Sequence, residues 1–316
     1  MSTKITIIGA GSVGSAITND ILVQGIASEV VMIDINKQKA MGEALDIYQG
    51  APFCAPAIIR SGDYEDAAGS QIVIITSGVP RKPGQTRLEL AQTNVNILKE
   101  ITPQIVKYAP DAIYILVSNP VDILTYVFTK ISGIPENRIL GSGTVLDTSR
   151  LQSELAKRFH ISPKNVHAHV YGEHGDSSFI PWSLATIANN KIDDYRNNVA
   201  DPSRIRWSKD DHQAVEDFVK QSGAQVIKSK GATFYAVAIS VCHICKCILN
   251  GSGTALTVST MMHGEYGVDD VCLSTLALVG SNGVHTKITS PLTAEEIEKM
   301  RLSAQKLKEI IGGLEI

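Results

Sequence analysis

The feature that most constrains the fold is a glycine-rich turn between an apolar run and a helix-like segment. Residues 4–11 read KITIIGAG, and residues 13–26 carry apolar side chains at helical spacing. Gly9, Gly11 and Gly14 have the spacing GxGxxG. The first glycine permits a sharp turn, the second lets a phosphate approach the backbone, and the third lets the helix pack closely on the strand. This segment therefore predicts a βαβ unit that binds a dinucleotide.

The residues around the turn also indicate which dinucleotide binds. The predicted helix starts at Ser12 and Val13, where unpaired N–H groups and a partial positive charge suit a pyrophosphate. Asp34 ends the next apolar run, VVMID. Its carboxylate can accept hydrogen bonds from ribose hydroxyls and repels a 2′-phosphate, so we expect NAD rather than NADP. The alternative is that the glycines only shape the turn of an ordinary βαβ unit.

The pattern beyond the turn predicts the fold class and two domains. Strand-length apolar runs alternate with helical patterns in the first half, which is typical of a parallel sheet covered on both faces. We expect an α/β protein, with a Rossmann-type doubly wound parallel sheet in residues 1–143 and a mixed α+β substrate domain in residues 144–316. In the second half we expect helices at 146–159, 210–231 and 232–249, strands and hairpins between 254 and 290, and a final amphipathic helix after a capping box of Thr293 and Glu296.

Charge and cysteine content narrow the possible partners. The 29 Lys and Arg residues nearly balance the 32 Asp and Glu residues, so no footprint for nucleic acid or an anionic membrane is visible. We find no signal peptide, and no run reaches the roughly 18 apolar residues of a membrane span. The odd number of cysteines, 5, argues against a disulfide framework. These observations favour a cytoplasmic protein that binds small molecules.

Polar residues in three stretches indicate the chemistry of a site. The basic segment GVPRKPGQTR (78–87) predicts a mobile loop that meets an anion. In GSGTVLDTSR, Asp147 and Arg150 are spaced to share one face of a helix, while His174 lies in the glycine-flanked turn GEHGDS. Hydride transfer to a 2-oxo acid needs such parts: a proton donor, a carboxylate that orients it, and a guanidinium that grips the substrate carboxylate.

These stretches, together with SNPVDILTY and SKGATFYAVA, carry a family resemblance. Over nearly its whole length the chain resembles the NAD-dependent lactate/malate dehydrogenases, and its body looks like their bacterial L-lactate branch. The resemblance implies that His174 is the acid/base, that Asp147 is its partner and that Arg150 binds the substrate carboxylate. It implies reduction of pyruvate by NADH to L-lactate, in a homodimer or homotetramer.

The resemblance also implies roles for three residues outside this cluster. Arg87, on the basic loop, would polarise the substrate carbonyl. Asn119 would hydrogen-bond the substrate and contact the cofactor, and Thr233 would line the substrate pocket.

The choice of substrate depends on Arg81, where the sequence departs from the usual lactate pattern. Lactate enzymes of this family typically carry Gln at this loop position, and malate enzymes carry Arg. A second carboxylate, as in oxaloacetate, could form a bidentate pair with Arg81, whereas pyruvate would offer it only a methyl group. The stretches around His174 and Thr233 nevertheless look lactate-type. We therefore expect an L-lactate dehydrogenase, with malate dehydrogenase as the alternative and a branched 2-oxo acid as a third option.

Two further features bear on regulation and metals. Many bacterial lactate dehydrogenases are activated by fructose 1,6-bisphosphate through an arginine and a histidine. The histidine matches His167, but Gln152 stands at the arginine position, so we expect weak or absent activation.

A metal site built on His167, His169 and the His174 turn is a weaker hypothesis, and we expect no metal. The cysteines of CHICKC (242–247) are expected to be buried structural residues.

Hypotheses from other classes also remain open. The chain could be an NAD-binding sensor without turnover, or a recruited structural protein. The presence of His174, Asp147, Arg150 and Arg87 together favours an enzyme over both.

Overall fold

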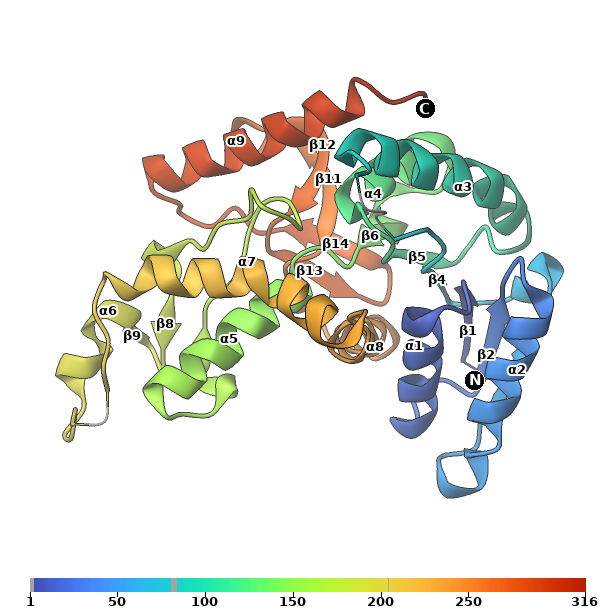
Figure 1. Ribbon diagram of the computed structural model, residues 1–316, viewed down its shortest axis with the longest axis horizontal. Helices are drawn as coiled ribbons and strands as arrows, with labels where there is room; N and C mark the ends of the chain where they lie inside the picture. The colour runs from blue at the N-terminus through green and yellow to red at the C-terminus, as the bar shows by residue number, and fades with distance from the viewer. Residues whose placement is uncertain (1–2, 81–83, 204) are drawn as a thin grey trace.

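A parallel sheet occupies the centre of the computed structural model, which describes residues 3–80, 84–203 and 205–316. The central sheet has the strand order β12-β11-β6-β5-β4-β1-β2-β3 (Figure 1). From β6 to β3 all neighbours are parallel, in the 3-2-1-4-5-6 order of doubly wound dinucleotide-binding folds. The parallel strands are β1 Lys4–Ile8, β2 Glu29–Ile33, β3 Ile58–Ser61, β4 Ile72–Ile75, β5 Ile113–Leu116 and β6 Ile139–Gly141. The predicted fold class is confirmed.

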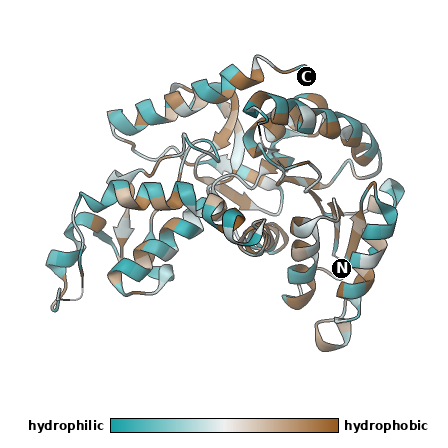
Figure 2. Cartoon of the chain, in the orientation of Figure 1, coloured by the Kyte–Doolittle hydropathy of each residue, from teal (hydrophilic) through white to brown (hydrophobic). Residues whose placement is uncertain are grey.

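Helices cover both faces of this sheet, as the uninterrupted apolar strands require. On β4, Ile72 and Ile74 face one apolar cluster, and Val73 and Ile75 face the other. The first cluster includes side chains of α1 Ser12–Val23, α2 Lys37–Tyr48 and α8 Tyr235–Leu249; the second includes side chains of α3 Arg87–Tyr108, α4 Val121–Ile131 and α9 Ala294–Ile311. Hydrophobic residues accordingly concentrate on the strands, and hydrophilic ones on the outer helices (Figure 2).

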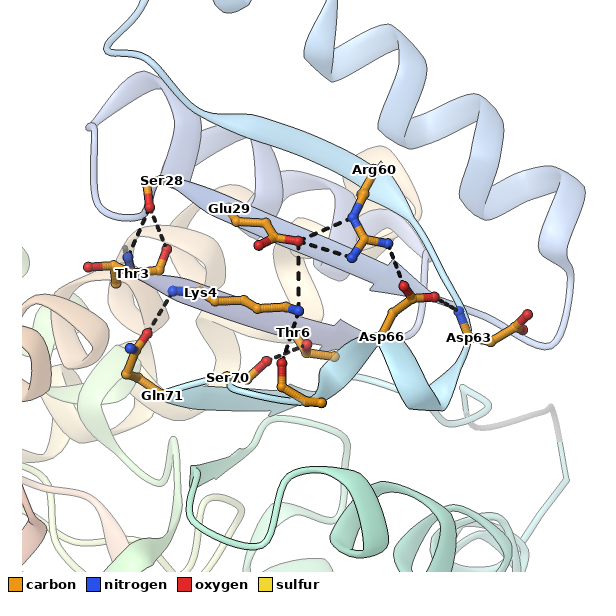
Figure 3. Close-up of polar contacts among 11 residues, drawn as sticks. Thr3, Lys4, Thr6, Ser28, Glu29, Arg60, Asp63, Asp66, Ser70 and Gln71 are labelled. Atoms are coloured by element: carbon orange, nitrogen blue, oxygen red, sulfur yellow. Dashed lines mark hydrogen bonds and ion pairs between the residues drawn. The ribbon is translucent and has the colours of Figure 1, made fainter. Parts of the chain in front are cut away.

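Polar contacts hold the edge of the sheet where apolar packing is thin. The Arg60 guanidinium of β3 lies 3.0 Å from Glu29 of β2 and 2.8 Å from Asp66 (Figure 3). Asp66 also accepts the Asp63 N–H at 2.9 Å. One guanidinium therefore ties β2 and β3 to the turn that follows β3.

The second half of the chain extends the central sheet and builds two smaller ones. Ser259 of β11 Ser259–His263 pairs with Gly141 of β6, and β12 Asp269–Ser274 pairs with β11, both antiparallel. One small sheet has the order β10-β13-β14 and the other β7-β8-β9. Their strands are β7 Val166–His167, β8 Thr186–Ile187, β9 Asn190–Lys191, β10 Thr254–Leu256, β13 Ala277–Gly280 and β14 Gly283–Lys287, and the remaining helices are α5 Val145–Phe159, α6 Ile192–Tyr195 and α7 Asp211–Lys230.

The predicted helices of the second half are present, with one difference. The capping box of Thr293 and Glu296 starts α9 as expected. The apolar sequence of α8 predicts burial on most sides. Val241 and Cys242 are buried in the apolar cluster shared with α1, whereas Tyr235 and Ile239 are exposed, 66% and 58% respectively. Among the described residues, no helix is both long and apolar enough to cross a membrane.

Candidate active site and cofactor groove

The three glycines of the first turn differ in what surrounds them. Gly9 has φ +110°, and a Cβ there would lie 2.7 Å from Thr76 Oγ1. A Cβ at Gly14 would lie 1.9 Å from the Gly9 carbonyl oxygen. At Gly11, by contrast, a Cβ would meet nothing within 4 Å. Gly9 and Gly14 therefore allow the strand and helix to pack, whereas Gly11 borders open space.

That open space belongs to a groove of about 580 Å³, lined by Gly9, Gly11, Asp34 and Thr76 among other residues. Helix α1 begins at Ser12, and its N-cap residue Gly11 offers no side-chain cap. Ser12 is exposed and Val13 half-exposed in this first turn. The turn thus presents backbone N–H groups beside a space with room for a phosphate.

Asp34 lines the same groove, and backbone N–H groups already orient its carboxylate. Its Oδ2 accepts the Ala10 N–H at 2.7 Å, and its Oδ1 accepts the Asn36 N–H at 2.8 Å. Each carboxylate oxygen keeps a further lone pair for an incoming hydroxyl. A helix N-terminus, an open glycine and a fixed carboxylate along one groove fit an NAD-type dinucleotide.

A second constellation brings together three of the predicted residues. His174 Nδ1 lies 2.5 Å from Asp147 Oδ2, and Arg150 Nη1 donates to Asp147 Oδ1 at 2.8 Å. The Asp147 side chain is 9% exposed and that of Arg150 18%. Both residues lie in the first two turns of α5, so the predicted shared face is confirmed. The carboxylate is therefore bound on both oxygens, which fixes the imidazole and the guanidinium relative to each other.

The backbone of the His174 turn is fixed by three separate elements. Gly172 exchanges two backbone hydrogen bonds with Ser274 of β12. The Glu173 N–H donates to Ser303 Oγ of α9 at 2.8 Å, and the His174 N–H donates to Asp122 Oδ2 of α4 at 2.7 Å. Asp122 and Ser303 are site residues that sequence reasoning missed. Asp122 lies in the quoted stretch SNPVD, where its charge next to an apolar run was a usable signal, whereas Ser303 gave none.

The electrostatics of the site favour a charged imidazole. Asp147 raises the pKa of His174 to about 9, against the opposing effect of burial. Burial also acts to raise the pKa of Asp147, but the charges and hydrogen bonds of His174 and Arg150 outweigh it and lower that pKa. Near neutral pH the pair is an imidazolium and a carboxylate, so His174 holds a proton that it can donate.

Arg87 lies near this turn but pairs with its acids rather than with the histidine. Its guanidinium is paired with Asp176, lies 3.7 Å from Glu173 and is 48% exposed. Arg87 is the first residue of α3, not part of a loop as expected. The reason is a capping box in which Thr86 and Glu89 bond each other's backbone N–H, a signal that the sequence already contained.

Of the remaining predicted site residues, two can be located in the structure. Arg81 lies outside the described residues. Asn119 is exposed, and its backbone carbonyl oxygen accepts the Asn94 side-chain amide at 2.7 Å. Thr233 is half-buried in the connection between α7 and α8. The structure therefore brings His174, Asp147 and Arg150 into direct contact and leaves Asn119 and Thr233 outside that contact.

The metal and cysteine sites considered from the sequence show no comparable arrangement among the described residues. Within the described ranges, no three His, Cys, Asp or Glu side chains form a group that could hold a metal ion. Cys242, Cys245 and Cys247 are buried and unpaired by disulfides, as predicted. A larger open groove of about 880 Å³ is lined by residues of α6, α7 and α9, and none of the predicted site residues lies in it.

Comparison with known proteins identifies the family. Residues 3–141 match the lactate/malate dehydrogenase NAD binding domain, and residues 144–315 match the lactate/malate dehydrogenase alpha/beta C-terminal domain. The chain belongs to the lactate/malate dehydrogenase family. Members of this family are NAD-dependent oxidoreductases of 2-hydroxy acids, and the resemblance stated from the sequence is confirmed.

Individual members of the lactate/malate dehydrogenase family resemble the chain over its full length. An L-lactate dehydrogenase of Clostridium botulinum is 46% identical over 312 residues, 99% of this chain and 97% of that protein. L-lactate dehydrogenase 1 of Clostridium acetobutylicum is 46% identical over 313 residues, 99% of each chain. The crystal structure of a minor L-lactate dehydrogenase from Enterococcus mundtii superimposes with a TM-score of 0.93 at 38% identity, covering 98% of both chains. A lactate dehydrogenase from a deep-sea metagenome gives a TM-score of 0.94 at 34% identity, covering 99% of both chains.

Proposed function

We propose that this protein is an NAD-dependent L-lactate dehydrogenase that interconverts pyruvate and L-lactate. The contact of His174, Asp147 and Arg150 carries the proposal, because it combines a proton donor with a cation suited to a substrate carboxylate. The similarity to proteins named L-lactate dehydrogenase supports pyruvate as the 2-oxo acid.

In the proposed reaction the residues around His174 act in fixed roles. Arg150 binds the substrate carboxylate with its free guanidinium edge, while Asp147 keeps the proton on His174 Nδ1 and leaves Nε2 facing the substrate. His174 then donates its Nε2 proton to the carbonyl oxygen. Bound NADH supplies the hydride to the carbonyl carbon, so pyruvate, NADH and one proton give L-lactate and NAD.

Residues outside this contact complete the proposed site. Arg87 exchanges its present acidic partners for the substrate carbonyl oxygen, where its charge stabilises the developing alkoxide. Asn119 bonds the substrate and contacts the cofactor, and Thr233 lines the pocket.

For the cofactor we propose NAD rather than NADP. Gly11 and the N-terminus of α1, with Ser12 and Val13 in its first turn, would hold the pyrophosphate. Gly9 and Gly14 shape that turn, and the carboxylate of Asp34 would accept hydrogen bonds from the ribose hydroxyls. We assign cofactor binding to residues 1–143 and substrate binding to residues 144–316.

Exposed apolar surface supports the proposal of a homo-oligomer, either a dimer or a tetramer. The large apolar side chains exposed on three helices are Met41, Leu45 and Tyr48 of α2, Phe218, Val226 and Ile227 of α7, and Tyr235 and Ile239 of α8. A second copy of the chain would bury such surface. We further propose a cytoplasmic location, consistent with cysteines that form no disulfide among the described residues.

A malate dehydrogenase is the alternative, and it rests on Arg81. A guanidinium at that position suits the second carboxylate of oxaloacetate.

The test of the proposal is NADH oxidation by pyruvate, with the product resolved as L- or D-lactate. We expect rapid oxidation and L-lactate, and loss of turnover in His174→Gln. NADH binding without consumption by any 2-oxo acid would instead identify a sensor.

A further inference from the structure

A buried carboxylate holds the backbone of His174 and has no lysine or arginine partner among the described residues. Asp122 is 2% exposed and is the second residue of α4. Its Oδ1 accepts the hydroxyl of Ser259 at 2.6 Å and its Oδ2 accepts the His174 backbone N–H at 2.7 Å. Across residues 3–80, 84–203 and 205–316, its hydrogen-bond partners are these two neutral donors, and it forms no ion pair with lysine or arginine.

An ionised carboxylate in this buried position destabilises the folded protein unless a nearby positive charge compensates it. Burying an ionised carboxylate without a cation destabilises a protein, and an amide could fill the same space and accept the same N–H. The N-terminus of α4 offsets part of this cost through its dipole. The remaining positive charge near Asp122 is the imidazolium of His174, whose backbone it already holds.

We propose that Asp122 is a positioning residue for His174, a second carboxylate that fixes the histidine backbone and supplies negative charge to the imidazolium. The role assigned to His174 rests on the proposed function, but the interaction between Asp122 and His174 exists without substrate. Asp147 orients the ring from its Nδ1 side, and Asp122 acts from the backbone side. Two carboxylates on two different helices thus serve one imidazole.

The protonation behaviour of the neighbours agrees with this arrangement. Asp147 raises the pKa of His174 first, and the charge of Asp122 adds to it, whereas Arg150 opposes it. Burial raises the pKa of Asp122 to about 6, and the hydrogen bonds from Ser259 and His174 limit that rise, while Glu173 adds to it. On the β12 side, burial raises the pKa of the Cys272 thiol, so this neighbour stays neutral. The groups around Asp122 are therefore arranged to keep it ionised when His174 is charged.

The decisive variant is Asp122→Asn, which keeps the shape and an acceptor for the His174 N–H but removes the charge. We expect the His174 pKa, followed by ¹⁵N NMR of the substrate-free enzyme, to fall by about 1. The basic limb of the kcat/KM profile for pyruvate should move to lower pH by the same amount. The matched control is Ser303→Ala, which removes a neutral contact to the same turn and should leave both midpoints unchanged.

A folded Asp122→Asn protein with an unchanged His174 pKa would overturn the proposal and leave Asp122 a structural residue. If that variant does not fold, the reciprocal measurement decides, because coupling between two titrating groups is mutual. In His174→Gln the Asp122 carboxyl, followed by ¹³C NMR, should titrate at a higher pH than in the unmodified enzyme. An unchanged midpoint there would also overturn the proposal. Because both NMR readouts need no turnover, a protein inactive on pyruvate would contradict the proposed function without touching this inference.

Discussion

Asp147 Oδ2 and His174 Nδ1 lie 2.5 Å apart, with the carboxylate side chain only 9% exposed. This contact joins the start of α5 to a turn that follows β7, and it sets the charge of the imidazole. Because Asp147 raises the pKa of His174 to about 9, the contact affects stability as well as chemistry.

The first prediction concerns stability against pH. The folded-state pKa of His174 is above its ordinary value, so its contribution to folding is complete below about pH 6.5 and is lost as the pH rises through about 9. Urea unfolding should therefore show a free energy of unfolding that falls by about 3 kcal/mol over this window. In Asp147→Asn the fall should be smaller, because the largest cause of the raised pKa is gone. Parallel pH dependences for the two proteins would contradict the assigned pairing.

A second prediction separates two glycines of the same turn. Gly14→Ala should destabilise the protein by about 2 kcal/mol or more, because its Cβ would collide with the Gly9 carbonyl oxygen. Gly11→Ala should change the free energy of unfolding by less than about 1 kcal/mol, since nothing lies within 4 Å of the added atom. It should nevertheless weaken NADH binding about 10-fold or more, because the methyl group enters the space of the pyrophosphate. Calorimetry and NADH titration measure both effects, and normal NADH affinity in Gly11→Ala would refute the placement of the cofactor.

A third prediction concerns Arg87. Arg87→Gln should slow single-turnover hydride transfer about 100-fold and leave NADH affinity unchanged, because its charge acts on the developing alkoxide. Arg138→Gln is the matched control, since that guanidinium pairs with Asp111 on the surface. Unchanged hydride transfer in Arg87→Gln would show that its contacts with Asp176 and Glu173 are purely structural.

The fourth prediction concerns regulation. The amide of Gln152 donates to the Ala168 carbonyl oxygen at 3.2 Å, next to His167, and offers no positive charge to a bisphosphate. Millimolar fructose 1,6-bisphosphate should change the half-saturating pyruvate concentration by less than about twofold. Gln152→Arg should make the enzyme more responsive. A large drop in the unmodified protein would contradict this expectation.

The strands and helices that depend on local sequence patterns could be predicted well. Apolar runs such as residues 4–11 predicted the strands of the parallel sheet, because a strand buried on both faces must be apolar throughout. The attachment of β11 to β6 could not be predicted, since the pairing of Ser259 with Gly141 links distant segments whose sequences carry no shared pattern.

Part of the active site could likewise be predicted from the sequence. Asp147 and Arg150 are close in sequence, so helix geometry alone brings them together. Asp122 and Ser303 act through contacts with the His174 turn that only the tertiary structure creates. Arg87 was assigned to a loop because the proline and glycine signals outweighed the capping box that follows them.

The central claim, reduction of pyruvate, is tested most directly by kcat/KM for pyruvate and oxaloacetate measured side by side with NADH. We expect a higher value for pyruvate, by about 10-fold or more, because the additional carboxylate of oxaloacetate must be desolvated in the substrate pocket. Arg81→Gln should widen that ratio, since it removes the cation that suits a second carboxylate. A higher kcat/KM for oxaloacetate in the unmodified enzyme would contradict the account and identify a malate dehydrogenase.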